Sequence, residues 1–265
     1  MDDERARRGR TPSPGQPRRS RRVRVAECDA VRFVLWFNAW SAGAVSLDEA
    51  RDGIVAVDAA HDVVGLPDRH ESVPLILALG VLRSERATGA GLALPVAGDP
   101  VGLGGPAEFN TEALEAGEAV VLEGTDLGLV PVRAGAGVVW RCLPASSRRQ
   151  VPSLAEADTD LRATLPRVAD ALADLEVARW RPEVADELMA LRSGDPLLLP
   201  PGADARVARM VDLADRCRHV VELALEDDGG AITAHESAAR REPLVRLDAA
   251  ARRTLVAACS HPWKD

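Results

Sequence analysis

Residues 119–143 have the sequence AVVLEGTDLGLVPVRAGAGVVWRCL, in which three apolar runs are separated by short links. The runs cover residues 119–123, 127–133 and 138–143, and the links contain glycine and only three or four residues each. Connections of this length can join antiparallel strands only, because parallel strands need a long crossover. The stretch therefore predicts a small antiparallel sheet.

Two features of these runs constrain how the strands pack. In the last run, alternation places Val138, Trp140 and Cys142 on one face of the sheet and the residues between them on the other. In the middle run, Pro131 has no backbone N–H to donate to a neighbouring strand. We therefore expect the middle strand to be bulged at Pro131 or to lie at an edge there.

The residues before the sheet predict helices with one additional strand. Residues 31–44 are apolar and aromatic, which is typical of a buried helix. Ser46 and Glu49 form a capping box, in which each side chain accepts a hydrogen bond from a backbone amide at a helix start. We expect that helix to run to about residue 64. Further predicted elements are a helix over 74–86, a strand over 91–96 and a short helix over 111–116.

The residues after 152 predict helices throughout. A second capping box, Ser153 with Glu156, opens a helix that Pro166 should kink. Apolar residues then recur at helical spacing over residues 204–225, and a last helix is expected over 248–259. Amphipathic helices joined by short links are typical of a bundle.

The predicted fold class is α+β, with a small antiparallel sheet and N-terminal helices followed by a C-terminal helical bundle. Three segments result. Residues 1–24 form a disordered Arg-rich tail, residues 25–150 an α/β subdomain with the antiparallel sheet, and residues 151–265 a helical bundle subdomain. The tail is predicted to be disordered because it has almost nothing to bury and cannot offset the entropy lost on ordering.

Charge is divided unevenly between the tail and the body. The tail holds nine arginines against three acidic residues, whereas the whole chain has a net charge of −8. The body is therefore acidic, which disfavours nucleic acid and anionic membranes as its partners. We interpret the tail as solvated or folded back on the body, and the alternative is a weak nucleic-acid contact through its arginines. No run of eighteen apolar residues occurs, so neither a membrane span nor a membrane partner is predicted.

The cysteine pattern points to a reducing compartment. No two cysteines are close in sequence, and all lie in or next to apolar runs, where cysteines usually behave as small buried side chains. An export signal, for which residues 18–22 are the nearest candidate, is the less favoured alternative because charged residues interrupt the apolar stretch that follows. We therefore expect a cytoplasmic protein. The four cysteines are Cys28, Cys142, Cys217 and Cys259.

Several stretches are similar to one known protein family. They are LWFNAW (35–40), LALPVAGDPVGLGGPAEFN (92–110), EAVVLEGTDLGLVPV (118–132), ARWRPEVADELM (178–189) and ALEDDGG (224–230). Together they resemble a family of uncharacterised actinobacterial proteins with no assigned function, over about residue 31 to the C-terminus. The resemblance implies a bacterial cytoplasmic origin and carries no chemistry to this chain.

The strongest local candidate for a ligand site is a glycine-rich loop. Its candidate ligand-binding residues are Asp99, Gly102, Gly104, Gly105 and Asn110. The loop lies between a predicted strand and a predicted helix, where open backbone amides and a helix start attract anions. It contains no lysine and matches neither the P-loop nor the dinucleotide-binding pattern. A structural crossover is the alternative that we favour.

Two further groups of residues suggest sites. Arg179, Trp180 and Arg181 place guanidinium groups on both sides of an indole, and such a corner can clamp an anionic or aromatic ligand. Packing of the indole between helices is the favoured alternative. A set of polar side chains offers the start of a metal site, but its spacing matches no known three-ligand pattern and polarity at a helix end explains it better. That set is Asp58, His61, Asp62, Asp68, His70 and Glu71.

No catalytic residue is predicted, because no pair of a nucleophile and a base can be identified in the sequence. No metal or cofactor is predicted either. We therefore expect a non-catalytic binding or scaffold protein in the bacterial cytoplasm that meets a protein partner, or a second copy of itself, through the bundle. The alternative is an enzyme or sensor that binds a small phosphorylated or anionic ligand between the glycine-rich loop and the corner at residues 179–181.

Overall fold

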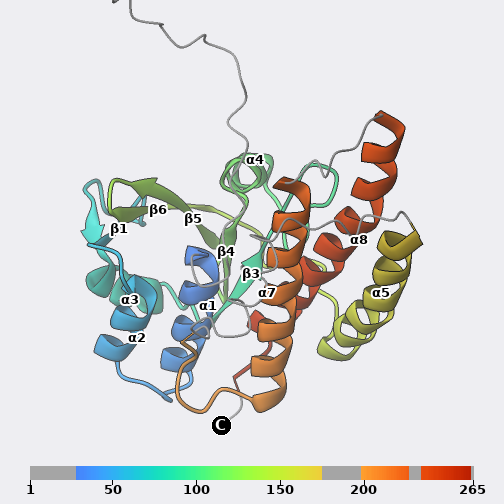
Figure 1. Cartoon of the computed structure of the whole chain (residues 1–265). Helices are drawn as coiled ribbons and strands as arrows, with labels where there is room; N and C mark the ends of the chain where they lie inside the picture. The colour runs from blue at the N-terminus through green and yellow to red at the C-terminus, as the bar shows by residue number, and fades with distance from the viewer. Residues whose placement is uncertain (1–27, 175–197, 227–233, 264–265) are drawn as a thin grey trace, which may run out of the picture.

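The computed structural model describes residues 28–174, 198–226 and 234–263 of the 265-residue chain. These residues form seven helices and one six-stranded sheet, which confirms the α+β class (Figure 1). The Arg-rich tail and the corner at residues 179–181 lie outside the described residues. No helix within the described part of the chain is long and apolar enough to cross a membrane.

The sheet has the strand order β2-β1-β6-β5-β4-β3. All neighbouring strands are antiparallel except β1 and β6, which are parallel. The predicted hairpins over residues 119–143 are confirmed as β4, β5 and β6, within one residue at each end. The strands are β1 (His61–Val64), β2 (Val73–Pro74), β3 (Gly89–Ala93), β4 (Ala119–Glu123), β5 (Leu127–Ala134) and β6 (Gly137–Pro144).

The predicted helix over residues 46–64 is wrong in its second half. The helix α2 (Leu47–Val55) starts at Ser46 with the expected capping box but ends at Ala56, whose backbone φ is +49°. Residues 61–64 instead form β1, and Val63 lies beside Trp140 of β6. A segment of four residues can be a helix end or a strand, and here pairing with the distant strand β6 makes it a strand.

The faces of the sheet follow the predicted alternation. Val138, Trp140 and Cys142 are buried, whereas the residues between them are half-buried. Pro131 lies in β5, but the pairing of β5 with β4 extends only as far as Leu129. The proline therefore sits where β4 no longer accompanies the strand, as the edge alternative requires.

Helices cover both faces of the sheet. On one face lies α1 (Asp29–Ser41), a helix so apolar that only Asn38 and Ser41 are not fully buried. It packs against β3, β4 and α2, while α3 (Leu75–Ser84) packs against β1. On the other face α4 (Ala107–Ala116) covers a smaller core around Phe109 and Val130. Figure 1 shows α1 near the centre of the molecule and α4 on the opposite side of the sheet.

The C-terminal helices are joined to the sheet through one of them. The helix α8 (Ala234–Cys259) packs against α5 (Leu154–Asp174), α7 (Ala205–Glu226), β3 and α1 (Figure 1). The capping box at Ser153 and Glu156 is confirmed by two hydrogen bonds. The last helix is longer than the predicted 248–259 and continues through Pro243. The end of α8 therefore lies beside the buried helix α1.

Candidate functional site: a pocket between α1, α7 and α8

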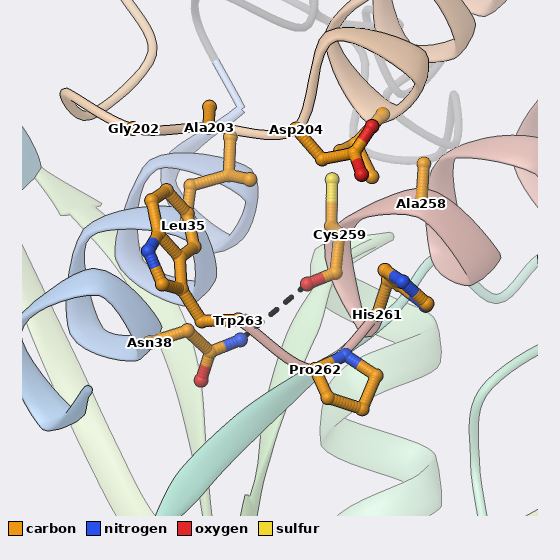
Figure 2. Close-up of a pocket in the computed structure, with 11 residues that line it drawn as sticks. Leu35, Asn38, Gly202, Ala203, Asp204, Ala258, Cys259, His261, Pro262 and Trp263 are labelled. Atoms are coloured by element: carbon orange, nitrogen blue, oxygen red, sulfur yellow. Dashed lines mark hydrogen bonds between the residues drawn. The ribbon is translucent and has the colours of Figure 1, made fainter. Parts of the chain in front are cut away.

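A pocket of about 130 Å³ lies where α1, the start of α7 and the end of α8 meet (Figure 2). Its volume is close to that of a cavity of roughly 150 Å³ that holds one benzene molecule. The pocket is therefore large enough for a single ring or a short aliphatic chain. Its lining consists of Leu35 and Asn38 from α1, Gly202, Ala203, Asp204 and Val207 from the start of α7, and Ala258, Cys259, His261, Pro262 and Trp263 from the end of α8.

Asn38 holds one wall of the pocket in place. Its Nδ2 atom donates hydrogen bonds to the carbonyl oxygens of Ala90 (2.8 Å) and Cys259 (3.4 Å), and its Oδ1 atom accepts one from the Ala90 N–H (2.7 Å). The amide therefore ties α1 to β3 and to the last turn of α8. Because these bonds use its amide group, Asn38 shapes the pocket more than it serves a ligand.

Cys259 contributes an apolar surface and no nucleophile. It is 1% exposed, and burial raises the pKa of its thiol to about 12. A thiol with such a pKa stays protonated at neutral pH, and the thiolate is the reactive form of cysteine. The side chain therefore behaves as a small buried hydrophobe, as the sequence predicts.

Asp204 places a carboxylate at the start of α7. Its Oδ1 atom accepts a hydrogen bond of 2.6 Å from the Arg206 N–H, which caps the helix. Figure 2 shows this carboxylate on the side of the pocket where the Cys259 thiol lies.

The segment that follows α8 brings two ring side chains to the pocket. The His261 N–H donates to the Ala258 carbonyl oxygen at 3.3 Å, which turns the chain at the end of the helix. Trp263 is half-buried and packs against the main core. In Figure 2 the Trp263 indole lies beside Leu35 and Asn38, and the His261 imidazole lies on the opposite side.

A second, more open pocket adjoins this one. It has a volume of about 460 Å³ and shares Asp204, His261 and Pro262 with the first pocket. Its far wall is the start of α5 around Ser153. His261 and Pro262 therefore lie between the two pockets.

The predicted glycine-rich site is assembled in one loop, but the contacts of that loop are internal. Asp99 accepts hydrogen bonds of 2.8 Å from both Arg252 and Arg253 of α8. The Gly105 N–H donates to Asn110 Oδ1 at 3.1 Å. These bonds fasten the loop to the body of the protein.

Two glycines of that loop, Gly102 and Gly104, face backbone, whereas Gly105 faces open space. A Cβ atom on Gly102 would lie 2.5 Å from the Leu92 carbonyl oxygen, and one on Gly104 would lie 2.6 Å from the Arg148 carbonyl oxygen. Both positions need glycine for packing, and both contacts come from this chain. This geometry supports the structural crossover over the phosphate site.

The predicted polar group is divided between two places. Asp58 and His61 lie together, with His61 Nε2 3.0 Å from Asp58 Oδ2. Asp68, His70 and Glu71 instead line an open groove of about 700 Å³ along the outer face of α3, where Leu77 is 61% exposed. Asp62 lies on β1 next to His61 and so points to the other face of the strand.

Asp29, Asp58 and His61 form a cluster whose ligand atoms lie within 4.8 Å of one another. Two arginines already occupy the carboxylates. Arg32 Nη2 lies 2.5 Å from Asp29 and 2.6 Å from Asp58, and Arg133 contacts the same pair at 2.9 and 2.5 Å. Both carboxyl groups of the cluster thus already hold two guanidinium partners.

A hydrogen bond from Trp140 determines which ring nitrogen of His61 carries the proton. The Trp140 indole N–H donates to His61 Nδ1 at 3.2 Å, so the imidazole carries its proton on Nε2 and donates it to Asp58. Burial lowers the pKa of His61, which keeps the ring neutral. A metal ion on Nε2 would move that proton to Nδ1 and oppose the indole N–H. The donor set therefore fits an ion-pair network better than a metal centre.

Comparison with known proteins places the chain in a family. The N-terminal domain described as "Rv1486c-like protein" matches residues 30–157, and the C-terminal domain of the same description matches residues 155–256. The chain belongs to the Rv1486c-like family. This result confirms the resemblance to a family without an assigned function.

Relatives of this Rv1486c-like chain are named only as uncharacterised proteins. Rv1486c of Mycobacterium tuberculosis (strain H37Rv) is 34% identical over 126 residues, which are 39% of this chain and 43% of the relative. ML1804 of Mycobacterium leprae is 26% identical over 252 residues, which are 74% of this chain and 84% of the relative. The matched region thus spans less than half of the M. tuberculosis protein. No solved structure gives a significant match to the chain.

The pocket joins the two domains of the Rv1486c-like family. Leu35 and Asn38 lie within the N-terminal match, Asp204 and Val207 lie within the C-terminal match, and Trp263 follows it. Sequence reasoning did not select these residues, because they converge from three distant segments. One local signal existed. His261 and Trp263, two residue types that occur only five times each in this chain, follow directly after a predicted helix end.

Proposed function

We propose that this protein is a non-catalytic binding protein that holds a small molecule, of about one ring in size, in the pocket between α1, α7 and α8. The observation that carries the proposal is a pocket of about 130 Å³ built by both family domains. Ligand sites commonly lie at such domain junctions and combine an apolar wall with a few polar groups. Here Leu35 and Val207 supply the wall, and Asp204 and His261 supply polar groups.

The chemistry of the lining supports binding over catalysis. The Cys259 thiol has a pKa of about 12, and the Asn38 amide is engaged with backbone groups. Neither side chain is thus available as a nucleophile or as a donor to a reacting atom. A pocket with these walls can recognise and retain a molecule.

Other expectations stay predictions. A protein partner or self-association through the bundle and a nucleic-acid contact through the Arg-rich tail remain to be tested. The same holds for a phosphorylated or anionic ligand at the glycine-rich loop. The internal contacts of Asp99, Gly102 and Gly104 make the loop the weaker candidate.

The test uses single-ring fragments and a variant that fills the pocket. Ala203 is half-buried and lines the pocket, so Ala203→Leu would add three carbon atoms to the cavity. Ala205 is exposed and lies outside the lining, so Ala205→Leu is the matched control on the same segment. Ligand-observed NMR with benzene-sized fragments at millimolar concentration should show binding to the wild-type protein and to Ala205→Leu, and its loss in Ala203→Leu. Binding that persists unchanged in Ala203→Leu would overturn the proposal.

A further inference from the structure

The helix α3 is apolar on both of its faces. Residues 75–82 have the sequence LILALGVL, which contains no polar side chain, and polar residues follow only at the end of the helix. One face packs into the core through Leu75, Ala78, Leu79 and Leu82. A helix that is apolar all round is normally buried on every side, whereas a surface helix carries polar residues on its outer face. The outer face of α3 therefore lacks the residues expected of a helix that meets only water.

This outer face forms one wall of a groove of about 700 Å³. The other wall is the segment of residues 68–74, which ends in β2. An exposed apolar surface rimmed by polar residues is typical of an interaction site. Figure 1 shows α3 on the side of the molecule away from α5 and α8. The outer face consists of Leu77, Gly80, Val81 and Ser84, which recur at helical spacing.

The shape of the outer face is complementary to itself. Leu77 is its large exposed side chain, and Gly80, one turn further along, has nothing within 4 Å of a built Cβ atom. In a two-fold dimer, residue i of one copy contacts residue j of the other, and residue j contacts residue i. A two-fold axis between residues 78 and 79 brings two copies of α3 together antiparallel, with each Leu77 in the empty space above the other copy's Gly80.

The charges at the two ends of α3 fit the same arrangement. Residues 68–74 hold two acidic side chains and one basic, whereas residues 83–86 hold two basic and one acidic. An antiparallel copy places the acidic end of one helix beside the basic end of the other. Of the two arginines, Arg83 stacks on the Trp40 ring of α1, so Arg86 is the candidate for a contact between copies.

Glu71 is the matching partner for Arg86. The two residues lie equally far in sequence from an axis between residues 78 and 79, on opposite sides of it. Both are exposed, and neither forms an ion pair with another residue in the described part of the chain. In the dimer each Glu71 would therefore face the Arg86 of the other copy, twice per dimer.

We propose that two copies of this chain form a two-fold dimer through the outer face of α3. The contact lies apart from the ligand pocket, because the two share no residue among those described that line them. It also differs from self-association through the bundle, since α3 belongs to the N-terminal domain. A standard interface buries roughly 800 Å² per partner, and one ten-residue helix with a short segment offers less, so the dimer should form only at about 10–100 µM.

Analytical ultracentrifugation of the full chain from about 1 to 300 µM tests the proposal. The mean mass should rise from that of one chain toward that of two. Leu77→Glu brings two carboxylates into the apolar contact, so it should weaken association at least about tenfold. Val57→Glu is the matched control, because Val57 is 96% exposed in the turn after α2 and lies outside the groove. It should leave association unchanged, and neither change at an exposed position should unfold the chain.

Gly80→Leu separates a fitted contact from general adhesion between apolar surfaces. The change makes the outer face more apolar but fills the space that receives Leu77, so association should weaken about tenfold. If exposed apolar area alone drove association, the same change would strengthen it.

Two charge reversals test the antiparallel arrangement. Glu71→Arg and Arg86→Glu should each weaken the dimer about threefold, because each sets like charges opposite one another at two places. The double variant should return to the wild-type affinity. Ala203→Leu, which fills the ligand pocket, should leave association unchanged, so that the dimer and the ligand proposal are judged separately.

Several results would overturn the dimer. A chain that stays monomeric at the highest concentration would do so and would leave the groove to a different protein. Association that survives Leu77→Glu, or that Gly80→Leu strengthens, would also contradict it. A double variant weaker than either single one would place Glu71 and Arg86 apart and rule out the antiparallel arrangement.

Discussion

At the scale of single residues, Asp29 and Asp58 share two guanidinium groups yet differ in their ionisation. Burial raises the pKa of Asp29 to about 7, and the negative charge of Glu118 adds to that effect against Arg32 and Arg133. Burial also acts upward on Asp58, but hydrogen bonds from His61 and Arg133 outweigh it and lower its pKa. Two carboxyls in one network thus divide between a protonated and an ionised form near neutral pH.

The pKa of Asp29 predicts a stability that depends on pH. Between its ordinary value of 3.8 and about 7, the folded protein holds a proton on Asp29 that the unfolded chain releases. The free energy of unfolding contributed by this group therefore falls as the pH rises through that window. His61 acts in the opposite sense, because its lowered pKa favours the neutral ring and its contribution is lost as the pH falls below 6.5.

Asp29→Asn should remove the first of these effects. We expect the difference in free energy of unfolding between wild type and variant to shrink as the pH rises from 4.5 to about 7 and then to level off. Urea unfolding at four pH values across that range measures it. Asp52→Asn, on an exposed carboxylate of α2, changes the charge equally without touching the buried network. Parallel curves for wild type and Asp29→Asn would show that Asp29 releases its proton in the folded state as well.

At the scale of elements, the sequence predicted best what depends on local patterns. The hairpins over residues 119–143 follow from alternation and glycine-containing turns, and the start of α2 follows from the capping box at Ser46. The strand β1 was missed because its pairing partner, β6, lies far along the chain. With only four residues, HDVV, the strand is too short to show a periodicity that could identify it.

The extent of α8 was missed for a different reason. The predicted helix began at residue 248, whereas α8 begins at Ala234, and the additional turns contain Pro243 and mostly polar or small residues, so no apolar stripe marks them as a helix. The candidate pocket was also missed, because Asn38, Asp204 and Trp263 come from three segments that only the folded chain brings together.

Replacing two helical glycines by alanine should change the stability of the protein in opposite directions. A Cβ atom on Gly53 of α2 would lie 2.1 Å from the buried Trp36 ring of α1, so Gly53→Ala should destabilise the protein by about 1–3 kcal/mol. Gly80 of α3 is exposed and has nothing within 4 Å of a built Cβ atom. Because alanine has the higher helix propensity, Gly80→Ala should stabilise the protein by about 0.5–1 kcal/mol.

Equilibrium urea unfolding of the two variants and the wild type decides this comparison. Each glycine lies inside a helix with ordinary backbone angles, so the helix propensity gained is the same and the difference reports the contact with Trp36. Equal stabilisation of both variants would mean that α2 can move away from α1 at little cost. That result would contradict the tight approach of the two helices.

At the scale of the whole molecule, α8 connects the sheet to the helical bundle. Its Arg252 bonds to the loop after β3 through Leu94 and Asp99, and the Ser260 hydroxyl beyond it accepts a hydrogen bond of 3.0 Å from the Leu92 N–H of β3. The same helix packs along α5 and α7. The two family domains therefore share one core, and we expect them to unfold together.

Arg252→Met tests this expectation in the full chain. The Arg252 side chain is 4% exposed and compensates two carboxylates, so its loss should cost about 3–5 kcal/mol. If the core is shared, hydrogen exchange in urea should show the same shift in midpoint for peptides of β3 and β4 as for peptides of α8. Arg246→Met on the same helix removes an exposed pair with Glu242 and should move neither midpoint noticeably. A sheet that kept its wild-type midpoint while α8 lost protection would mean that the N-terminal domain folds independently, and the pocket would then lie between two bodies able to separate around a ligand.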